Sequence, residues 1–264
     1  MKRVLVFLFL GIIAAPAQTN PPINSVPTVQ SQIMQPMRVQ EDLLGKVMRV
    51  ESQEYKMENG SKGELSGHEL TTFDQAGFYL ESSHMDKSGT MLKTSYTYDA
   101  KGNLSQKIES SSLVSAYKFD PASRTVTCQS LERDGSPGAK TVSIYDATGR
   151  EHEVTHLDAS GQQIHRATFE RNSAGKEVTV KFFDQSDAQT VEIDVTWNND
   201  GSVHEKVTHN LNGDQAVFDS KYDYPAHDDH GNWTQQVETT SFTSKNGDPI
   251  GQDQHLTERT LTYY

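Results

Sequence analysis

The sequence predicts an all-β fold: an elongated antiparallel meander of β-hairpins that forms a largely single-layer, curled sheet behind a disordered N-terminal segment. Three observations support this prediction. A turn signal recurs along most of the chain, the segments between turns alternate apolar and polar residues, and helical spacing is nowhere sustained. Only 34% of the 264 residues are hydrophobic, which favours a sheet with large exposed faces over a thick core.

The first 17 residues have the pattern of a secretory signal peptide. Lys2 and Arg3 precede an apolar run from Val4 to Ala15, and Ala15-Pro-Ala17 provides the small residues that signal peptidase requires. The run has about 12 residues, whereas a membrane-spanning helix needs about 20. We therefore expect cleavage after Ala17 and a secreted or periplasmic protein with no membrane span.

Residues 18–42 are rich in Pro, Gln, Asn and Ser and are expected to form a disordered linker, because they have too little apolar surface to offset the entropy of ordering. The repeats occupy the remaining residues, 43–264, as one domain. Its last part, about residues 228–264, is expected to cap the open edge of the sheet, since repeat proteins need a terminal unit that covers that edge.

The turn signal is an Asp or Asn followed three positions later by Gly. From Asp146 to Asn210 the first residues are separated by 12, 14, 12, 14 and 12 positions. Asp120 and Asp184 keep the spacing but lack the Gly. The predicted turn residues are Asp74 and Gly77, Asp86 and Gly89, Asp99 and Gly102, Asp146 and Gly149, Asp158 and Gly161, Asn172 and Gly175, Asn198 and Gly201, Asn210 and Gly213, and Asp228 and Gly231.

The chemistry of this signal is that of a hairpin. The Asp or Asn side chain binds the backbone two residues on, and Gly adopts the positive φ of a bulge that lets the return strand pair. About eight residues lie between turns, enough for one short strand. The spacing predicts roughly 14 to 17 strands, which at about 4.8 Å per strand would extend some 70 to 80 Å.

The residue before each turn is apolar or aromatic in most units. One interpretation is a packing stripe of cross-strand pairs. The other is a row of platforms on which a ligand stacks. Apolar residues are scarce, so the packing interpretation is favoured. These residues are Phe73, Met85, Tyr98, Phe119, Tyr145, Leu157, Phe183 and Trp197.

The segments Tyr98-Asp-Ala-Lys-Gly-Asn-Leu104 and Tyr145-Asp-Ala-Thr-Gly-Arg150 resemble the YD, or RHS, repeat, and residues 230–234 with 259–264 resemble the closing segment of its short secreted bacterial members. The resemblance covers about residues 65–264. It implies a continuous meander of antiparallel hairpins, used in large relatives as a shell around a toxin or as an adhesion module. The Asp-Pro-x-Gly-Leu junction of the toxins is lacking, so toxin delivery is not implied.

One motif suggests an enzyme. His152-Glu-Val-Thr-His156 matches the zinc-peptidase pattern, in which two His one helical turn apart bind the metal and Glu153 activates its water. The motif lies between the turns at Asp146 and Asp158, too short an interval for the helix and two loops. On a strand, residues four apart are about 13 Å apart, which a single ion cannot bridge. We therefore expect no zinc, no other cofactor and no catalytic residue.

Other site signals are weaker. His227, Asp228, Asp229 and His230 could bind a divalent ion, but Asp-rich turns are more often simply solvated. Cys128 is the single cysteine, so neither an intrachain disulfide nor a Cys-based metal cluster can form. The net charge of −12 becomes −14 without the first 17 residues, which argues against nucleic acid or anionic membrane as the main partner.

Three function classes remain. We expect a secreted, non-enzymatic binding or structural module whose partner is extended or multivalent, such as an envelope polysaccharide or another surface protein. A carbohydrate-binding version would use exposed aromatic rings. A zinc-dependent hydrolase would depend on His152, Glu153 and His156 alone. The candidate stacking residues are Tyr96, Tyr98, Tyr222, Tyr224 and Trp233.

Overall fold

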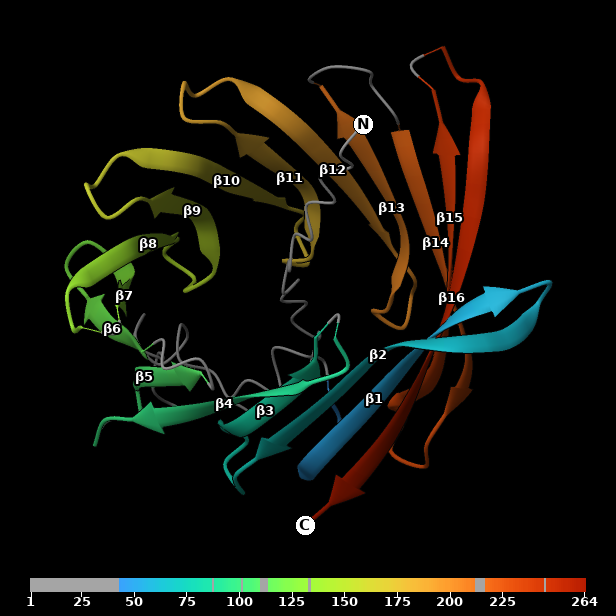
Figure 1. Cartoon of the computed structure of the whole chain (residues 1–264), viewed down its shortest axis with the longest axis horizontal. Coiled ribbons are helices and arrows are strands. Elements are labelled where there is room, and N and C mark those ends of the chain that lie inside the picture. Colours follow the sequence, from blue (N-terminus) through green and yellow to red (C-terminus); the bar gives the residue numbers. More distant parts are fainter. Residues whose placement is uncertain are drawn as a thin grey trace.

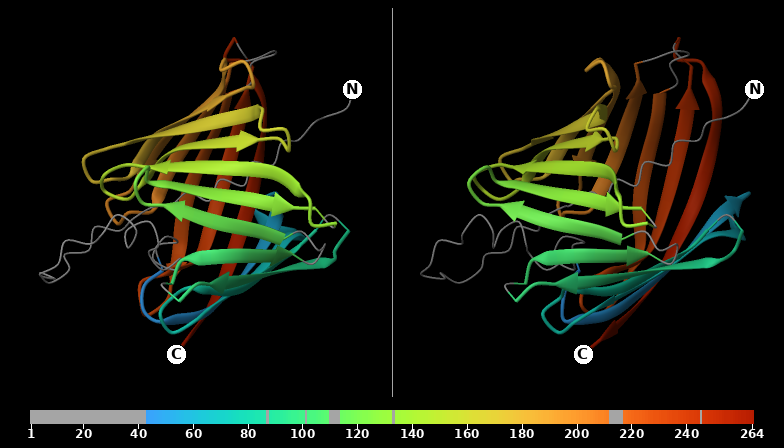
Figure 2. Two further views of the ribbon diagram at one scale, coloured as in Figure 1. Left: turned by 90° about the vertical axis from the view of Figure 1, so that its left-hand side faces the viewer. Right: turned by 60° about the vertical axis from the view of Figure 1, so that its left-hand side comes forward.

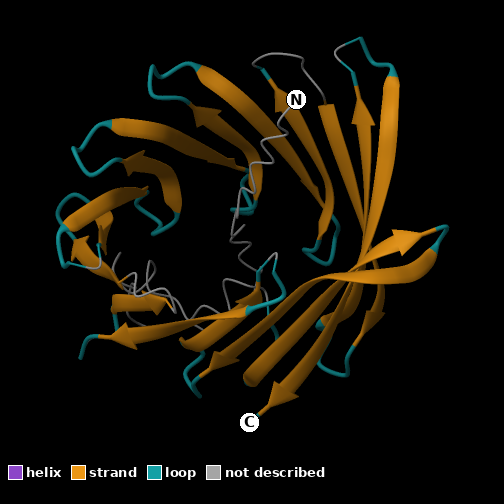
Figure 3. Ribbon diagram, in the orientation of Figure 1, coloured by secondary structure: helices purple, strands orange, loops and turns teal. Residues whose placement is uncertain are grey.

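The computed structural model describes residues 43–264 except 87, 101, 110–113, 133, 212–216 and 245, so the predicted signal peptide and linker lie outside the described residues. Within the described ranges every regular element is a β-strand (Figure 3). The strands are β1 (Val47–Glu58), β2 (Ser61–Phe73), β3 (Tyr79–Met85), β4 (Met91–Tyr98), β5 (Leu104–Glu109), β6 (Val114–Asp120), β7 (Thr125–Leu131), β8 (Pro137–Tyr145), β9 (Glu151–Leu157), β10 (Gln163–Arg171), β11 (Glu177–Phe183), β12 (Gln189–Trp197), β13 (Val203–Asn210), β14 (Val217–His227), β15 (Trp233–Thr243) and β16 (Pro249–Tyr263).

Each strand pairs antiparallel with the next, and β16 returns to pair with β1, from Val47 opposite Tyr263 to Lys56 opposite His255. The meander is therefore a closed 16-strand barrel, and Figures 1 and 2 show the ring of strands from its end and from its sides. The predicted all-β antiparallel meander is confirmed, whereas the prediction that its curled sheet stays open and elongated is wrong, because the sheet closes into a barrel. Twist brings the first and last strands together, and their pairing satisfies backbone groups that two open edges would leave unpaired.

Eleven turns among the described residues share one hydrogen-bond pattern. The first residue's carbonyl accepts a bond of 2.8 to 3.1 Å from the N–H of the fourth, and its own N–H donates to the carbonyl of the fifth. The fourth residue has positive φ, as at Gly149 (80°) and at Asp187 (64°), which stands where Gly is absent. Two of these turns, Glu132 to Gly135 and Ser244 to Gly247, were missed because neither begins with Asp or Asn. Gly213 lies outside the described residues.

One face of the wall contains the buried strand residues, and we call it the inner face. Register connects them across the wall, as in the row Val50, Thr71, Ser82 and Thr94 and in the row Ala167, Phe182 and Val191. Inward and outward residues alternate along a barrel strand. The neighbouring positions carry ion pairs of partly exposed side chains, such as Lys93 with Glu81 at 2.5 Å, and form the outer face.

Two hydrophobic clusters lie on the inner face. The first contains Leu43, Val47, Val50 and Phe73, with Tyr79, Leu261 and Tyr263 packed against it, and it joins β1, β2 and β16 where the barrel closes. The second contains Ala167, Val180 and Phe182 on β10 and β11, with Phe169, Val191 and Ile193 around it. Full burial of each large apolar side chain contributes about 1.5–3 kcal/mol to the free energy of folding. These two sectors of the wall therefore contribute much of the hydrophobic stabilisation of the barrel.

The turns alternate between two ends of the barrel. The end that contains the turns 74–77, 99–102, 146–149, 172–175, 198–201 and 228–231 also contains Leu43 and Tyr264, and we call it the packed end. The opposite end contains the turns 86–89, 132–135, 158–161, 184–187 and 244–247 and the tip of the β1–β2 hairpin at Asn59 and Gly60, and we call it the free end.

Candidate functional site

The five candidate stacking residues are half-buried and lie on the inner face in two groups. Tyr96 and Tyr98 belong to β4 and contact the first hydrophobic cluster. The ring of Tyr96 lies 5.2 Å from that of Tyr79, and its hydroxyl is 3.1 Å from Ser82 Oγ. Tyr98 packs at 5.1 Å against Phe78 and donates a 2.9 Å hydrogen bond to the Tyr79 carbonyl. Burial raises the pKa of Tyr98, as expected for a ring in a packed wall.

The second group lies on β14 and β15. Tyr222 donates to Glu238 at 3.2 Å, and the pKa of its hydroxyl is raised by burial. The ring of Tyr224 lies 5.8 Å from that of Trp233, and the Arg259 guanidinium covers Trp233 at 3.9 Å. These contacts favour packing over ligand stacking, because a covered ring face offers a ligand little area.

The residues before the turns divide between the two faces. Phe73, Tyr98, Tyr145 and Trp197 precede turns of the packed end and lie on the inner face, whereas Met85, Leu157 and Phe183 precede turns of the free end and lie on the outer face. Phe73 is fully buried and the other residues of this stripe, Phe119 included, are half-buried. None has the exposure expected of a stacking platform.

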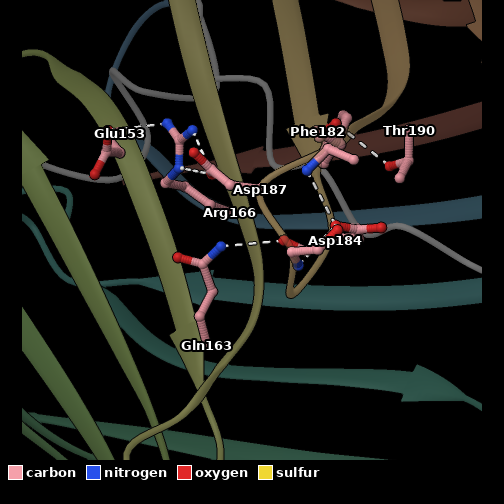
Figure 4. Close-up of polar contacts among 9 residues, drawn as sticks. Glu153, Gln163, Arg166, Phe182, Asp184, Asp187 and Thr190 are labelled. Atoms are coloured by element: carbon pink, nitrogen blue, oxygen red, sulfur yellow. Dashed lines mark hydrogen bonds and ion pairs between the residues drawn. The ribbon is translucent and has the colours of Figure 1, made fainter.

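The residues of the zinc-peptidase motif do not converge. All three lie on β9, where His152 and His156 share the inner face and Glu153 lies on the outer face, because successive strand residues alternate. Arg166 joins Glu153 at 3.2 Å to Asp187 of the β11–β12 turn at 2.7 Å (Figure 4). In the part of the chain that the structure describes, no three His, Cys, Asp or Glu residues are placed to hold a metal ion.

His156 has a different partner. Its ring stacks on that of His165 at 4.2 Å, and its Nδ1 is 3.1 Å from Thr141 Oγ1. Burial lowers the pKa of both imidazoles, and the neighbouring His165 lowers that of His156 further. Two neutral imidazoles can stack closely without charge repulsion, so the pair belongs to the packing of β9 against β10.

The Asp-rich turn at 227–230 is also occupied by internal contacts. The Asp228 carboxylate accepts hydrogen bonds from Tyr263 and from the N–H groups of His230 and Asn232, each N–H at 2.9 Å. Burial would raise the pKa of Asp228, but these bonds hold it below its usual value. The turn therefore uses Asp228 to position Tyr263 in the closing strand.

A hollow of about 570 Å³ lies on the inner face towards the free end, where β1, β2, β3 and β16 meet. Cross-strand register builds it. Glu54 of β1 lies between Gly67 of β2 and Thr257 of β16, and Ser52 lies opposite Glu69. His84 of β3 lies directly opposite Glu69. These six positions form a polar lining, and Met85 and Asp86 complete its rim.

Two carboxylates dominate the hollow. The side chain of Glu69 is accessible to solvent, yet the surrounding strands crowd it, and this partial burial raises its pKa although His84 and Arg259 oppose the shift. Glu54 Oε1 lies 2.8 Å from His255 Nδ1. A methyl group at Gly67 would lie 3.1 Å from Glu54 Oε2 and 3.2 Å from Glu54 Cβ, so a side chain at position 67 would crowd Glu54 where it lies across β2. The Glu54 carboxylate, which His255 holds in place, and the partly buried Glu69 carboxylate beside it can bind a cationic or hydroxyl-bearing group.

The hollow was not found from the sequence. Its residues lie in β1, β2, β3 and β16, and Glu54, Glu69 and Thr257 stand in no turn or repeat motif. Glu54 and Thr257 are about 200 positions apart, and only the closing pair of strands brings them together. Strand alternation alone could not place Ser52, Glu54 and Glu69 on the same face, because the register of β1 against β2 must also be known.

The described part of the chain contains no helix long and apolar enough to cross a membrane.

Neither the protein-family models nor the curated proteins include a match to this sequence. Similar solved structures include a porin-like protein from Bacteroides uniformis at 10% identity and TM-score 0.41, covering 83% of this chain and 98% of that one. They also include a TcdB2-TccC3-Cdc42 structure (11% identity, TM-score 0.28, 74% of this chain and 14% of that one) and a Photorhabdus luminescens Tc holotoxin pore (10% identity, TM-score 0.25, 71% and 15%). At these values the similarities establish neither a family nor a function.

Proposed function

We propose that this protein is a secreted, non-enzymatic binding module that acts at the bacterial envelope or outside the cell, and that it is a short relative of the YD/RHS repeat family. The signal-peptide pattern of residues 1–17 supports secretion. The repeated turn chemistry, with a Tyr-Asp pair at Tyr98 and at Tyr145, supports the family. The hollow around Glu54 and Glu69 is the single observation that supports binding.

The hollow suits binding better than chemistry. Its polar groups come from four strands of the closed wall and are therefore positioned by backbone pairing, which limits their movement. It lies towards the end of the barrel at which the turn glycines have no side-chain neighbours, so the approach is not occupied by the packing contacts of the opposite end. A partner can thus reach it without unfolding the wall.

A pair of variants tests this function. Ser52→Phe fills the hollow, whereas Gln53→Phe adds the same side chain to the adjacent position on the outer face. We expect the unmodified protein and the Gln53→Phe variant to retain the same partner from envelope and culture extracts, and Ser52→Phe to lose it while keeping its melting temperature. Equal retention by both variants would place binding elsewhere on the barrel.

The carbohydrate-binding alternative depends on exposed aromatic rings. Tyr96, Tyr222 and Tyr224 use their hydroxyls in hydrogen bonds to neighbouring strands, and Arg259 covers Trp233. No observation therefore favours this alternative over the hollow. Replacing Tyr224 by Ala should lower stability and leave partner retention unchanged, whereas a graded loss of polysaccharide binding on such replacements would support stacking.

The hydrolase alternative depends on Glu153, which pairs with Arg166 on the opposite face from the two histidines of its motif. We expect Glu153→Gln to change no measurable turnover and dialysed protein to hold well under one equivalent of zinc. A turnover abolished by Glu153→Gln, or stoichiometric zinc lost in His152→Ala, would replace the binding function by a hydrolase.

Secretion has its own test. Mass spectrometry of periplasmic or culture material should find a chain that begins at Gln18. An intact Met1 or Lys2 start in that material would contradict cleavage after Ala17.

A further inference from the structure

The hollow has an unbalanced charge. Among the described residues its lining includes three carboxylates, those of Glu54, Glu69 and Asp86, and neither Lys nor Arg, while Arg259 of β16 lies beside it, opposite Ser52. His68, whose backbone borders the same region, turns its imidazole to the outer face, where Nε2 lies 3.0 Å from Glu51. Partners of opposite charge are attracted to a recess lined by one sign of charge, and the chain as a whole has a net charge of −12. The electrostatics therefore favour a cationic ligand.

Glu69 is the group that a cation would engage. No described residue donates a hydrogen bond to its carboxylate, whereas Asp86 already accepts bonds from Ser88 and Thr90 at its turn. Crowding by the wall disfavours the ionised form of Glu69, and a bound cation would supply the charge and donors that this form lacks. Glu69 is thus accessible and, among the described residues, without a hydrogen-bond donor.

Glu54 provides a second acceptor on the same face. Glu54 is paired with Gly67, two positions before Glu69 on β2. Glu54 and Glu69 are therefore diagonal neighbours on one face, for which the typical separation is roughly 7–8 Å. The contact with His255 holds the Glu54 side chain across the wall, and Gly67, which has no side chain, leaves room for it. Two carboxylates at this separation can share the N–H groups of one planar guanidinium or accept hydrogen bonds from one ammonium.

Two other ligand classes fit less well. Metal ions need ligands at about 2.0–2.6 Å, and the described residues contain no group of three acidic, His or Cys side chains so placed. Sugars are commonly held by an aromatic ring, and no described Tyr, Trp or Phe lines the hollow.

We propose that the hollow between β1, β2, β3 and β16 binds an alkylammonium or guanidinium group through Glu69 and Glu54. This inference rests on the proposed binding function and names the chemistry of its ligand. The same group occurs in free polyamines and in the Lys or Arg side chains of a polypeptide, so the experiment below includes both sources.

Calorimetry on the full secreted chain tests the proposal. Cadaverine and L-argininamide represent free cations, an acetylated and amidated Lys-Lys dipeptide represents a polypeptide source, and 1,5-pentanediol is the uncharged analogue of cadaverine. We expect binding of the cations and none of the diol. Tighter binding of the dipeptide than of cadaverine would identify a polypeptide partner, and the reverse a free amine. Binding of no cation, or equal binding of the diol, would overturn the proposal.

Glu69→Gln keeps the shape of the side chain and removes its charge. Glu81→Gln does the same on the outer face of β3, where Glu81 pairs with Lys93. We expect Glu69→Gln to weaken cation binding about tenfold, the effect of losing one charge-assisted hydrogen bond, and Glu81→Gln to change it less than twofold. Equal affinities of the two variants would exclude Glu69 as the acceptor.

The outcomes separate this inference from the proposed function. If Ser52→Phe abolishes partner retention while no cation binds, the hollow is a binding site for another chemistry. If Ser52→Phe retains the partner, the proposed function itself fails at this site. Cation affinity should also fall as the pH is lowered and Glu69 is protonated. Glu54, His84, Asp86, His255 and Arg259 face the same region, so the contribution of Glu69 is the difference between the pH profiles of the unmodified protein and the Glu69→Gln variant.

Discussion

The two ends of the barrel are built from the same turn but differ in what surrounds it. At the free end, no heavy atom beyond the chain neighbours lies within 4 Å of the place where a Cβ would stand on the turn glycines Gly89, Gly135, Gly161 and Gly247. At the packed end, a neighbouring side chain reaches the corresponding position of each of Gly102, Gly175, Gly201 and Gly231. The local backbone is thus the same, and the tertiary contacts are not.

The packed end is where the chain closes. Asn232 is 4% exposed and accepts a 2.6 Å bond from the Leu44 N–H, while its amide donates to the Leu44 carbonyl at 2.9 Å and to the Tyr263 hydroxyl at 2.8 Å. His230 stacks on Tyr263 at 3.9 Å. These contacts tie the residues before β1, the β14–β15 turn and the last strand together, so this end stabilises the closed form.

Buried charge is found at the same end. Arg171 pairs with Glu177 at 2.5 Å and donates to the Glu151 carbonyl, and burial raises the pKa of both Glu151 and Glu177. Lys176 donates to the Gly201 carbonyl at 2.9 Å from one turn to the next. At the free end the turn aspartates instead bind the Ser two positions on and remain in water. The difference teaches that the repeat provides turns, and that one end has added stabilising contacts while the other has been left accessible.

The largest effect should follow removal of the closing strands. Deleting residues 232–264 removes β15 and β16 and leaves β1 and β14 as open edges, so we expect aggregation in light scattering. This deletion also tests the predicted terminal cap. Inserting two Gly residues into the free-end turn at 244–247 should leave the protein monomeric. A truncated chain that stays monomeric with unchanged melting would show that closure does not depend on this segment.

Asn232→Ala should be the most damaging single substitution in this comparison. It removes three hydrogen bonds to Leu44 and Tyr263 in a buried setting, at a cost of about 3 kcal/mol in the free energy of unfolding. Asn246→Ala, in the exposed β15–β16 turn, is the matched control and should cost less than about 0.5 kcal/mol. Urea denaturation measures both, and equal costs would remove the distinction between the ends.

Replacing a turn glycine sharpens the comparison. Gly161→Ala at the free end forces Ala into positive φ (86°) with open space around it, which should cost about 1 kcal/mol. Gly231→Ala at the packed end meets the same strain and places a methyl group 3.3 Å from Leu44 Cδ1, so we expect about 2 kcal/mol. The two variants should be compared by denaturant midpoint, and a larger cost at Gly161 would contradict the assignment of the ends.

The smallest effect concerns protonation. The hydrogen bond from Ser160 holds the pKa of Asp158 below its usual 3.8, so the stabilisation it gives is present above that value and is lost as the pH falls through the folded-state pKa. Ser160→Ala should raise the Asp158 pKa towards 3.8 in an NMR titration. Glu151 and Glu177 have the opposite sign, because burial raises their pKa above 4.5 and stability falls as the pH rises through that window. Titration of all three below 4 would contradict this contrast.

The turns were predictable because their information is local. Each turn needs a side chain that accepts backbone N–H groups and, three residues later, a residue that adopts positive φ. Four consecutive residues contain both features, and the Asp146 and Asp158 carboxylates do accept these N–H bonds. The same turn begins with Glu132 and with Ser244, where only the Gly at the fourth position signalled it. The first position of the turn thus accepts Glu and Ser as well as the Asp and Asn of the predicted signal.

The faces of the strands were only partly predictable. Most of these turns introduce a register irregularity, and the residue before the turn points inwards at Tyr145 and outwards at Leu157, the two residues of successive turns. A stripe that looks uniform in the sequence therefore divides between two faces. The hollow was hidden for the same reason, since Glu54, Glu69 and Thr257 share a face only once the register of three strands is set.

The sequence by itself determined the strand class, the hairpin order and most turn positions, because each depends on alternation and on residues a few positions apart. Tertiary structure alone decided that the meander closes, since β1 and β16 pair across some 200 residues and any strand edge offers the same backbone groups to any other. It also decided which end is packed and where the carboxylates of Glu54 and Glu69 meet, because side chains on one face become neighbours only after the wall has closed.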